Sequence, residues 1–236
     1  MNTLLLRFAA PLQAWGTDSK FDIRRTDREP SKSGVTGLLA AALGRRRDAD
    51  LSDLSALRFG VRTDREGRLI RDFHMVHKDE KTSYVTTRFY LSDAVFLVGL
   101  EGESSFLETV DKALREPKYP LFLGRRSCPP TLPLTLGIRP CGLEEALMHE
   151  PPLTKGFHTA QLPILVEPTD PENGTGRRND LAISFDPAER LHAYRPIRYA
   201  GIADTSSGQA EHDPFSALDD PDSDNTEGGS DGFIAI

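Results

Sequence analysis

The residues best suited to chemistry stand in one short stretch, 119–130, which reads Tyr-Pro-Leu-Phe-Leu-Gly-Arg-Arg-Ser-Cys-Pro-Pro. Gly124 allows a positive φ and a close approach of the backbone to a ligand. Arg125, Arg126 and Ser127 follow at once, and the planar fork of arginine suits a phosphate and also stacks on bases. The stretch therefore predicts a contact with phosphates or bases. The alternative is an ordinary surface loop with solvated arginines.

A second cationic segment surrounds the start of an expected helix at 34–43. Arg24 and Arg25 lie in the loop before this helix, and Lys32 and Ser33 stand directly at its start. The free N–H groups and the positive dipole end of a helix N-terminus attract anions, so this segment also predicts a phosphate contact. Simple capping of the helix by hydroxyls is an equally good interpretation. No glycine-rich phosphate loop precedes these residues, so nucleotide hydrolysis is not supported.

A third group lies in an expected hairpin at 70–92, which contains His74, His77, Lys81 and Arg88. Cleavage of RNA without a metal needs a base for the 2′-hydroxyl and a cation for the scissile phosphate. The two histidines are three residues apart and would face opposite sides of a strand, so they would not act together. A basic hairpin that grips RNA is the favoured interpretation, with cleavage as the alternative.

The acidic balance of the chain comes from one segment. The 236 residues include 36 acidic and 29 basic side chains, and nine of the acids lie in 201–236, which has no Lys or Arg. The first 130 residues hold 22 basic against 18 acidic side chains. The net charge of −7 therefore describes 201–236, and it does not argue against a nucleic-acid partner.

Composition excludes several classes of protein. No charge-free run reaches the roughly 18–20 apolar residues of a membrane helix, and the first residues lack the basic region of a signal peptide. Two cysteines are too few for a disulfide scaffold or a zinc site. We expect a reduced, cytoplasmic protein that has no metal, no cofactor and no membrane partner.

The apolar periodicity predicts an α+β domain. Strands are expected at 3–8, 58–63, 69–76, 85–100 and 134–138, and helices at 34–43 and 104–116. This is the βαββαβ order of a ferredoxin-like fold, to which RNA-recognition domains also belong. Two helices would cover one face of the sheet and leave the other face free to bind, as in RNA-recognition sheets.

We expect the chain to divide into three regions. Residues 1–140 form the ferredoxin-like domain, whose long hairpin at 70–92 projects from it, and residues 141–200 add a small β-rich extension. Residues 201–236 read as an acidic, disordered tail because they combine high charge with no apolar periodicity. The only tryptophan, Trp15, follows the first strand and is expected to pack in the core rather than stack on a base.

Four motifs in order closely resemble the CasD family of subunits of type I-E Cascade, a CRISPR surveillance complex, within the RAMP superfamily. The resemblance covers about residues 3–140. The motifs are Leu6–Gly16, Pro30–Gly44, Arg71–His74 and Tyr119–Pro130.

The resemblance implies a RAMP fold with a projecting thumb and a noncatalytic role. Such a subunit holds the 5′ handle of the crRNA and caps one end of the backbone filament. Its partners would be the backbone subunit, the large subunit, the crRNA and, through the complex, the target DNA. The handle contacts would be Arg24, Arg25, Lys32, Ser33, Tyr119, Gly124, Arg125, Arg126 and Ser127, and the thumb would carry His74, Lys81 and Arg88.

A related RAMP subunit cuts the repeat RNA itself with a Tyr, Lys and His set. The hairpin histidines of this chain lack a clear partner tyrosine in the sequence. We therefore expect binding without cleavage, and a metal-independent endoribonuclease that processes repeat RNA remains the alternative.

Overall fold

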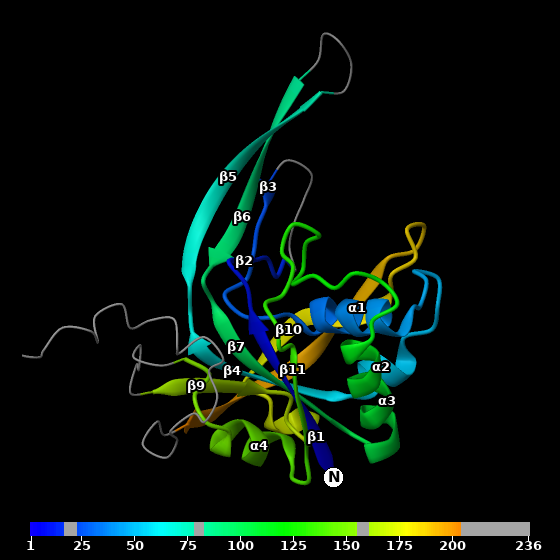
Figure 1. Cartoon of the computed structure of the whole chain (residues 1–236), viewed down its shortest axis with the longest axis vertical. Helices are drawn as coiled ribbons and strands as arrows, with labels where there is room; N and C mark the ends of the chain where they lie inside the picture. The colour runs from blue at the N-terminus through cyan, green and yellow to red at the C-terminus, as the bar shows by residue number, and fades with distance from the viewer. Residues whose placement is uncertain (17–22, 78–82, 155–160, 204–236) are drawn as a thin grey trace, which may run out of the picture.

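The computed structural model describes residues 1–16, 23–77, 83–154 and 161–203. Figure 1 shows a body of helices packed on a strongly twisted sheet, with one long hairpin projecting from it. The mixed helix and strand content is as the sequence predicts. The tip of the hairpin and residues 204–236 lie outside the described residues. The disorder expected at 201–236 therefore stays a prediction for the residues from 204 on.

The main sheet has seven strands in the order β10-β11-β9-β4-β7-β1-β8, and every pairing in it is antiparallel. β1 lies between β7 and the edge strand β8, and it is apolar on both faces because each face packs into a core, with Leu4, Leu5 and Leu6 fully buried. The three strands from 162–203 extend the same sheet at the edge of β4. The bounds are β1 Asn2–Ala9, β4 Arg58–Arg65, β7 Val95–Gly102, β8 Thr135–Arg139, β9 Leu162–Val166, β10 Gly176–Ser184 and β11 Leu191–Ala203.

One face of this sheet is covered by α1 (Lys32–Leu43), α2 (Ser52–Ala56) and α3 (Ser104–Arg115). α1 begins at its N-cap Ser31, whose hydroxyl accepts a hydrogen bond from the Gly34 N–H at 3.3 Å, and it ends at Gly44 with φ 75°. The end agrees with the sequence, whereas the helix begins two residues before the expected start at 34. Within the described ranges, no helix is long and apolar enough to cross a bilayer.

The opposite face of the sheet is not free, and the expectation of an open RNA-binding sheet is wrong. α4 (Leu143–His149) packs across it, and its leucines join Leu5 and Leu97 in a second apolar core. Gly60 and Gly99 let the helix approach, since a Cβ on either would lie under 3 Å from a leucine of α4. An RNA-binding surface must therefore lie elsewhere.

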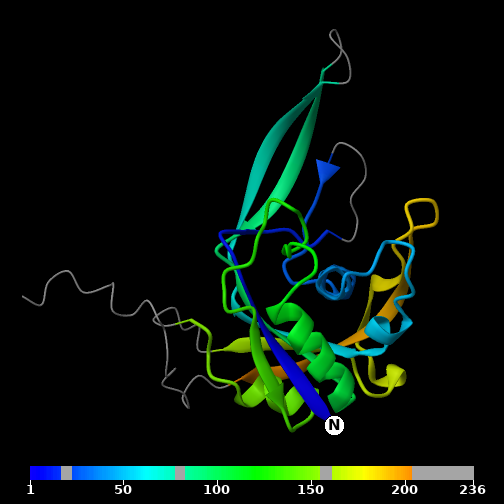
Figure 2. The same ribbon diagram turned by 45° about the vertical axis from the view of Figure 1, so that its right-hand side comes forward.

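The projecting hairpin consists of β5 (Arg68–His77) and β6 (Ser83–Ser92) and stands clear of the body in Figures 1 and 2. The short strands β2 (Leu12–Gln13) and β3 (Ile23–Arg24) pair with β6 at its base. A single 3-10 turn, η1 (Pro171–Asn173), precedes β10.

The single strand expected at 85–100 is wrong, because the chain breaks between β6 and β7. Asp93 has φ 56°, a left-handed conformation that aspartate tolerates better than most residues. Its N–H donates to the Pro11 carbonyl at 3.2 Å. The break sends β6 into the hairpin and β7 into the centre of the main sheet.

Candidate nucleic-acid interface

Cationic side chains from three separate segments converge where the hairpin leaves the body. β3 pairs with β6 there, and the loop 119–130 packs against both. Figure 1 shows β3 beside the lower part of β6. We call this the hairpin-base cluster, and define it as Arg24, Arg25, Arg88, Tyr90, Arg125, Arg126 and Ser127.

Arg125 joins the three segments of the hairpin-base cluster. Its Nη1 donates to the Phe89 carbonyl at 3.1 Å, and its Nη2 donates to the carbonyls of Arg24 at 2.9 Å and Arg25 at 3.3 Å. Its guanidinium carbon also stacks over the Tyr90 ring, 4.7 Å from the ring centroid. The side chain is only partly exposed, so its main role is to hold β3 and the loop against β6.

Tyr90 lies at the centre of the hairpin-base cluster and is 3% exposed. Burial raises the pKa of its hydroxyl, but hydrogen bonding with Ser127, Arg125 and Arg88 outweighs burial and the pKa falls below its usual value. The Nε of Arg88 is buried without a hydrogen-bond partner among the described residues. The cluster is thus cationic, which suits an anionic ligand.

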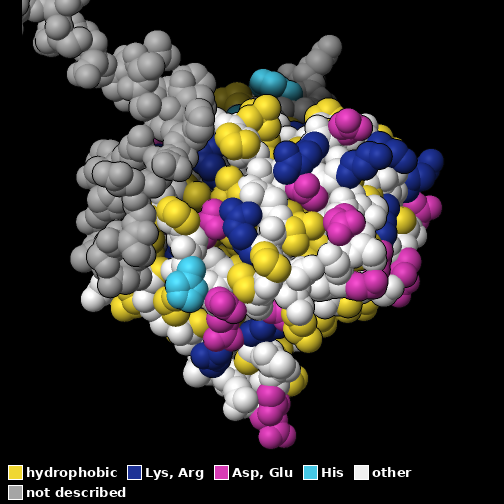
Figure 3. All heavy atoms as spheres, turned by 60° about the horizontal axis from the view of Figure 1, so that its bottom comes forward, with side chains coloured by type: hydrophobic (Ala, Val, Ile, Leu, Met, Phe, Trp, Pro, Cys, Tyr) yellow, Lys and Arg dark blue, Asp and Glu magenta, His cyan; other side chains and the backbone are white. Residues whose placement is uncertain are grey.

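The outer rim of the hairpin-base cluster is open to solvent. Arg24, Arg25, Arg126 and Ser127 are all exposed. The face of the body turned away from the hairpin differs, because basic and acidic side chains are interspersed on it in Figure 3. The base of the hairpin therefore offers exposed positive charge to an anionic polymer.

Gly124 is required by the chain's own packing. It has φ 85°, and a Cβ there would lie 1.7 Å from the Ala14 carbonyl oxygen. The Ala14 N–H donates to the Leu123 carbonyl at 3.2 Å on the same side. The sequence predicts that the backbone at Gly124 approaches a ligand closely. In the structure it approaches the neighbouring segment at Ala14 instead, and this contact positions Arg125, the next residue in the chain.

We expect Gly124→Ala to lower the melting temperature by more than 4 °C. An alanine there would cost about 1–2 kcal/mol because of its left-handed conformation, and its Cβ would also clash with Ala14. Differential scanning calorimetry measures this effect. The matched control is Gly137→Ala, because Gly137 has φ 91° but a Cβ there would meet only Arg139 Nη1 at 3.7 Å. Equal shifts for the two variants would contradict the role given to the contact with Ala14.

The structure gives Lys32 a setting that does not fit the predicted phosphate contact. Lys32 is 4% exposed, and its Nζ donates to both carboxylate oxygens of Glu167 at 2.8 and 2.9 Å. Its backbone N–H donates to Asp180 Oδ2 at 2.9 Å. With Ser31 capping Gly34, these partners of the helix N-terminus lie within the chain, and we remove Lys32 from the site. The contact expected of Ser33, which is partly exposed, stays a prediction.

Arg195 completes this buried ion-pair network, since its Nε donates to Asp180 Oδ1 at 2.6 Å. Burial lowers the pKa of Lys32, and the charge and hydrogen bonds of Glu167 offset part of that effect. The network ties the first helix to β9, β10 and β11. Its role is therefore structural.

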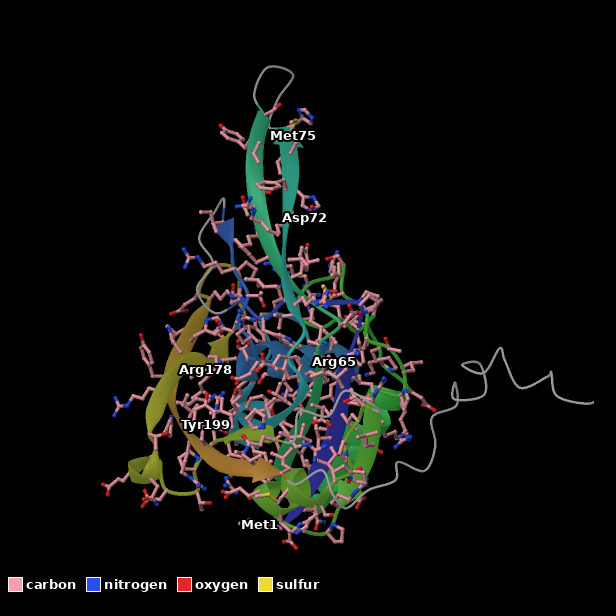
Figure 4. The ribbon with its side chains drawn as sticks, turned by 90° about the vertical axis from the view of Figure 1, so that its left-hand side faces the viewer. Met1, Arg65, Asp72, Met75, Arg178 and Tyr199 are labelled. Atoms are coloured by element: carbon pink, nitrogen blue, oxygen red, sulfur yellow. The ribbon has the colours of Figure 1, made fainter. Side chains whose placement is uncertain are left out.

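The remaining predicted residues lie apart from the hairpin-base cluster. His74 is farther out on β5, ion-paired with Asp72, and Figure 4 shows Asp72 and Met75 on the projecting part of the hairpin. Tyr119 lies beside the end of α1, where its N–H donates to the Ala41 carbonyl. Lys81 falls outside the described residues. Over the part of the chain that the structure describes, no three His, Cys, Asp or Glu side chains are placed to hold a metal ion.

Trp15 packs in the core, as the sequence favours. It is 1% exposed and stacks on Phe8 with ring centroids 5.5 Å apart. Sequence reasoning missed Tyr90, although a signal was available. Residues two apart in a strand share a face, so Arg88 already implied that Tyr90 stands beside it.

Comparison with known proteins identifies the relatives of this chain. The family model described as CRISPR-associated protein (Cas_Cas5) matches residues 3–198. The Cascade subunit CasD of Escherichia coli K12 is 40% identical over 157 residues, which cover 57% of this chain and 70% of that protein. This confirms the resemblance seen in the four motifs.

Two solved structures share the fold. A chain of a CRISPR RNA-guided surveillance complex superposes with a TM-score of 0.74 at 32% identity, covering 86% of this chain and 91% of that one. A Cas protein crystal structure superposes with a TM-score of 0.68 at 44% identity, covering 86% and 95%.

Proposed function

This chain belongs to the CRISPR-associated Cas5 family, and on that premise we propose that it is a noncatalytic, CasD-like subunit of a type I-E Cascade complex in the cytoplasm. It binds the 5′ handle of the crRNA and caps one end of the backbone filament. Its partners are the crRNA, the backbone subunit, the large subunit and, through the complex, the target DNA.

The hairpin-base cluster is the single observation that carries this proposal. Three chain segments bring arginines to one place, and the exposed rim presents Arg24, Arg25 and Arg126 to solvent. Guanidinium groups bind phosphates in a planar, bidentate geometry and stack on unpaired bases. A single-stranded RNA segment satisfies both, so the handle lies across the base of the hairpin.

The strand order supports assignment to the ferredoxin-like RAMP folds. Strands β4, β7, β1 and β8 are neighbours in that order, and in the chain they alternate with α1 and α3 as strand, helix, two strands, helix, strand. We assign residues 1–140 to this domain and 141–200 to a small β-rich extension. The β5–β6 hairpin is the thumb, and its exposed Phe73, Met75 and Val85 are available to a neighbouring subunit or to bases.

The spacing on the hairpin keeps His74 and Tyr90 from forming a joint cleavage site. His74 pairs in register with Thr86, four residues along β6 from Tyr90. At about 3.3 Å per residue, the imidazole and the low-pKa tyrosine are roughly 13 Å apart along the strand, too far to act on one phosphate.

The test mixes the full chain with its full-length repeat RNA in EDTA and runs native and denaturing gels side by side. We expect a shifted but intact RNA, and weaker binding of a control RNA of equal length that lacks the handle sequence. Cleaved RNA that disappears with His74→Ala would instead establish the endoribonuclease, and the absence of any shift at low salt would overturn the proposal.

A further inference from the structure

The hairpin-base cluster has a candidate ligand within this chain. Residues 204–236 carry nine acidic side chains and no Lys or Arg. We propose that this acidic segment binds the hairpin-base cluster and competes there with RNA phosphates. Only the competition with RNA rests on the proposed function, because contact between the acidic segment and the hairpin-base cluster does not depend on RNA.

Charge complementarity is the first argument. Five guanidinium groups lie in the hairpin-base cluster, and the acid in register opposite Arg88 is Asp72, which is ion-paired with His74. Arginine binds carboxylates with the same bidentate geometry that it uses for phosphates. The exposed Arg24 and Arg126 can therefore bind a carboxylate or a phosphate.

Reach is the second argument. The described chain leaves the sheet at the end of β11, Ala203, which pairs with Leu162 of β9 and lies on the body away from the hairpin tip. Thirty-three residues follow. Fully extended, they span about 110 Å, whereas a compact domain of this size has a radius of gyration of about 17 Å. The segment is thus long enough to reach the cluster around either side of the body.

Tethering is the third argument. A covalently linked ligand acts at an effective concentration of the order of millimolar, so individually weak carboxylate–arginine contacts suffice for occupancy. A phosphate-rich RNA that also offers bases for stacking displaces it, while nonspecific polyanions that offer phosphates alone do so poorly. The consequence is a higher threshold for binding: the acidic segment lowers the affinity for all RNA by a common factor, so that at a given RNA concentration only the tightest ligand stays well bound.

The first measurement detects the contact without RNA. Trp15 is the only tryptophan and adjoins Ala14, which bonds to the loop 119–130, so it reports energy transfer to an acceptor dye placed in the acidic segment. The dye is attached through Ser230→Cys in the full chain, in a Cys141→Ser background because Cys128 is buried. We expect transfer at low salt that is lost at high salt and when the nine acids of 204–236 are replaced by their amides.

The second measurement titrates handle RNA and a nonspecific RNA into the native and the amide-substituted full chains. We expect the amide variant to bind both RNAs about tenfold more tightly at low salt, with a gap from the native chain that closes as salt rises. The matched control replaces five exposed acids of the body by glutamine and leaves both affinities unchanged. These are Glu103, Glu108, Glu116, Glu172 and Glu189.

The outcomes separate this inference from the proposed function. Energy transfer that persists although no RNA binds supports the intramolecular contact and overturns RNA binding. RNA binding of equal strength in both chains, with no energy transfer, overturns the inference and leaves the proposed function standing. Energy transfer that bound RNA does not abolish places the acidic segment on another surface and also overturns the inference.

Discussion

Arg125→Ala is expected to weaken binding of handle RNA by about 30- to 150-fold, which corresponds to roughly 2–3 kcal/mol. The side chain makes three hydrogen bonds to carbonyl oxygens of two strands and stacks on Tyr90, so its removal releases the loop and β3 together. Fluorescence anisotropy of labelled handle RNA at fixed salt measures the loss.

Three comparison variants test why the effect of Arg125→Ala should be that large. Arg126→Ala removes an exposed charge from the same loop, and we expect a loss of only about threefold to tenfold with a shallower dependence on salt. Arg115→Ala removes an exposed arginine from α3, far from the hairpin-base cluster, and should change nothing. Arg125→Lys should not restore binding, because an ammonium cannot reach both strands in the same plane. Equal losses for Arg125→Ala and Arg126→Ala would contradict the positioning role of Arg125.

Glu167→Ala is expected to destabilise the fold by about 3–5 kcal/mol, because it leaves two buried cations without their shared carboxylate. Glu167 accepts from Lys32 Nζ, lies 3.8 Å from Arg195 Nε, and also accepts from the Phe59 N–H at 2.9 Å. A chain of this size should lose roughly 6–20 °C in melting temperature. Thermal unfolding followed by circular dichroism measures this.

The double variant Lys32→Met with Glu167→Leu should be much less destabilised than Glu167→Ala, because it removes the charges in pairs. A pH series adds a second check. Since burial holds the pKa of Lys32 below 10.5, the folded chain gives up this proton before the unfolded chain does. Its contribution to stability therefore rises with pH between the lowered pKa and 10.5, and Lys32→Met abolishes that rise. A Lys32→Met chain that is as stable as the native one but defective in RNA binding would restore Lys32 to the binding site.

What the sequence predicted well was local. Ser31 and Gly44 are the residue types that begin and end helices for reasons confined to a few neighbouring residues, and α1 follows them. The apolar run of the first strand likewise indicated a strand that is buried on both faces. The break at Asp93 carried only a weak signal, the polar pair Ser92 and Asp93, because neither glycine nor proline interrupts the apolar pattern between β6 and β7.

What the sequence could not predict depended on distant partners. Lys32 and its partner Glu167 are separated by 135 residues in the sequence. The residues around Lys32 therefore resembled a phosphate site, although Lys32 is one member of a buried ion pair. Arg125 bonds to carbonyl oxygens, which every residue possesses and no residue type reveals. Gly60 and Gly99 were a sequence signal that the face of the sheet beneath α4 is covered, since glycine within a strand often marks the close approach of another element.

The break between β6 and β7 has a mechanical consequence. The Gln13 side chain is fully buried there and donates to the Ala94 carbonyl at 2.7 Å, which clamps the joint to the neighbouring segment. The ten residues of β6 thus form an arm about 33 Å long, which is fused through a clamped joint to β7, an interior strand of the main sheet, and is held by β2 and β3 over the half nearer that joint. A force applied to the far end of β6 cannot be relieved by rotation at the joint between β6 and β7. It is therefore transmitted as torque to β7, and the body turns together with the arm.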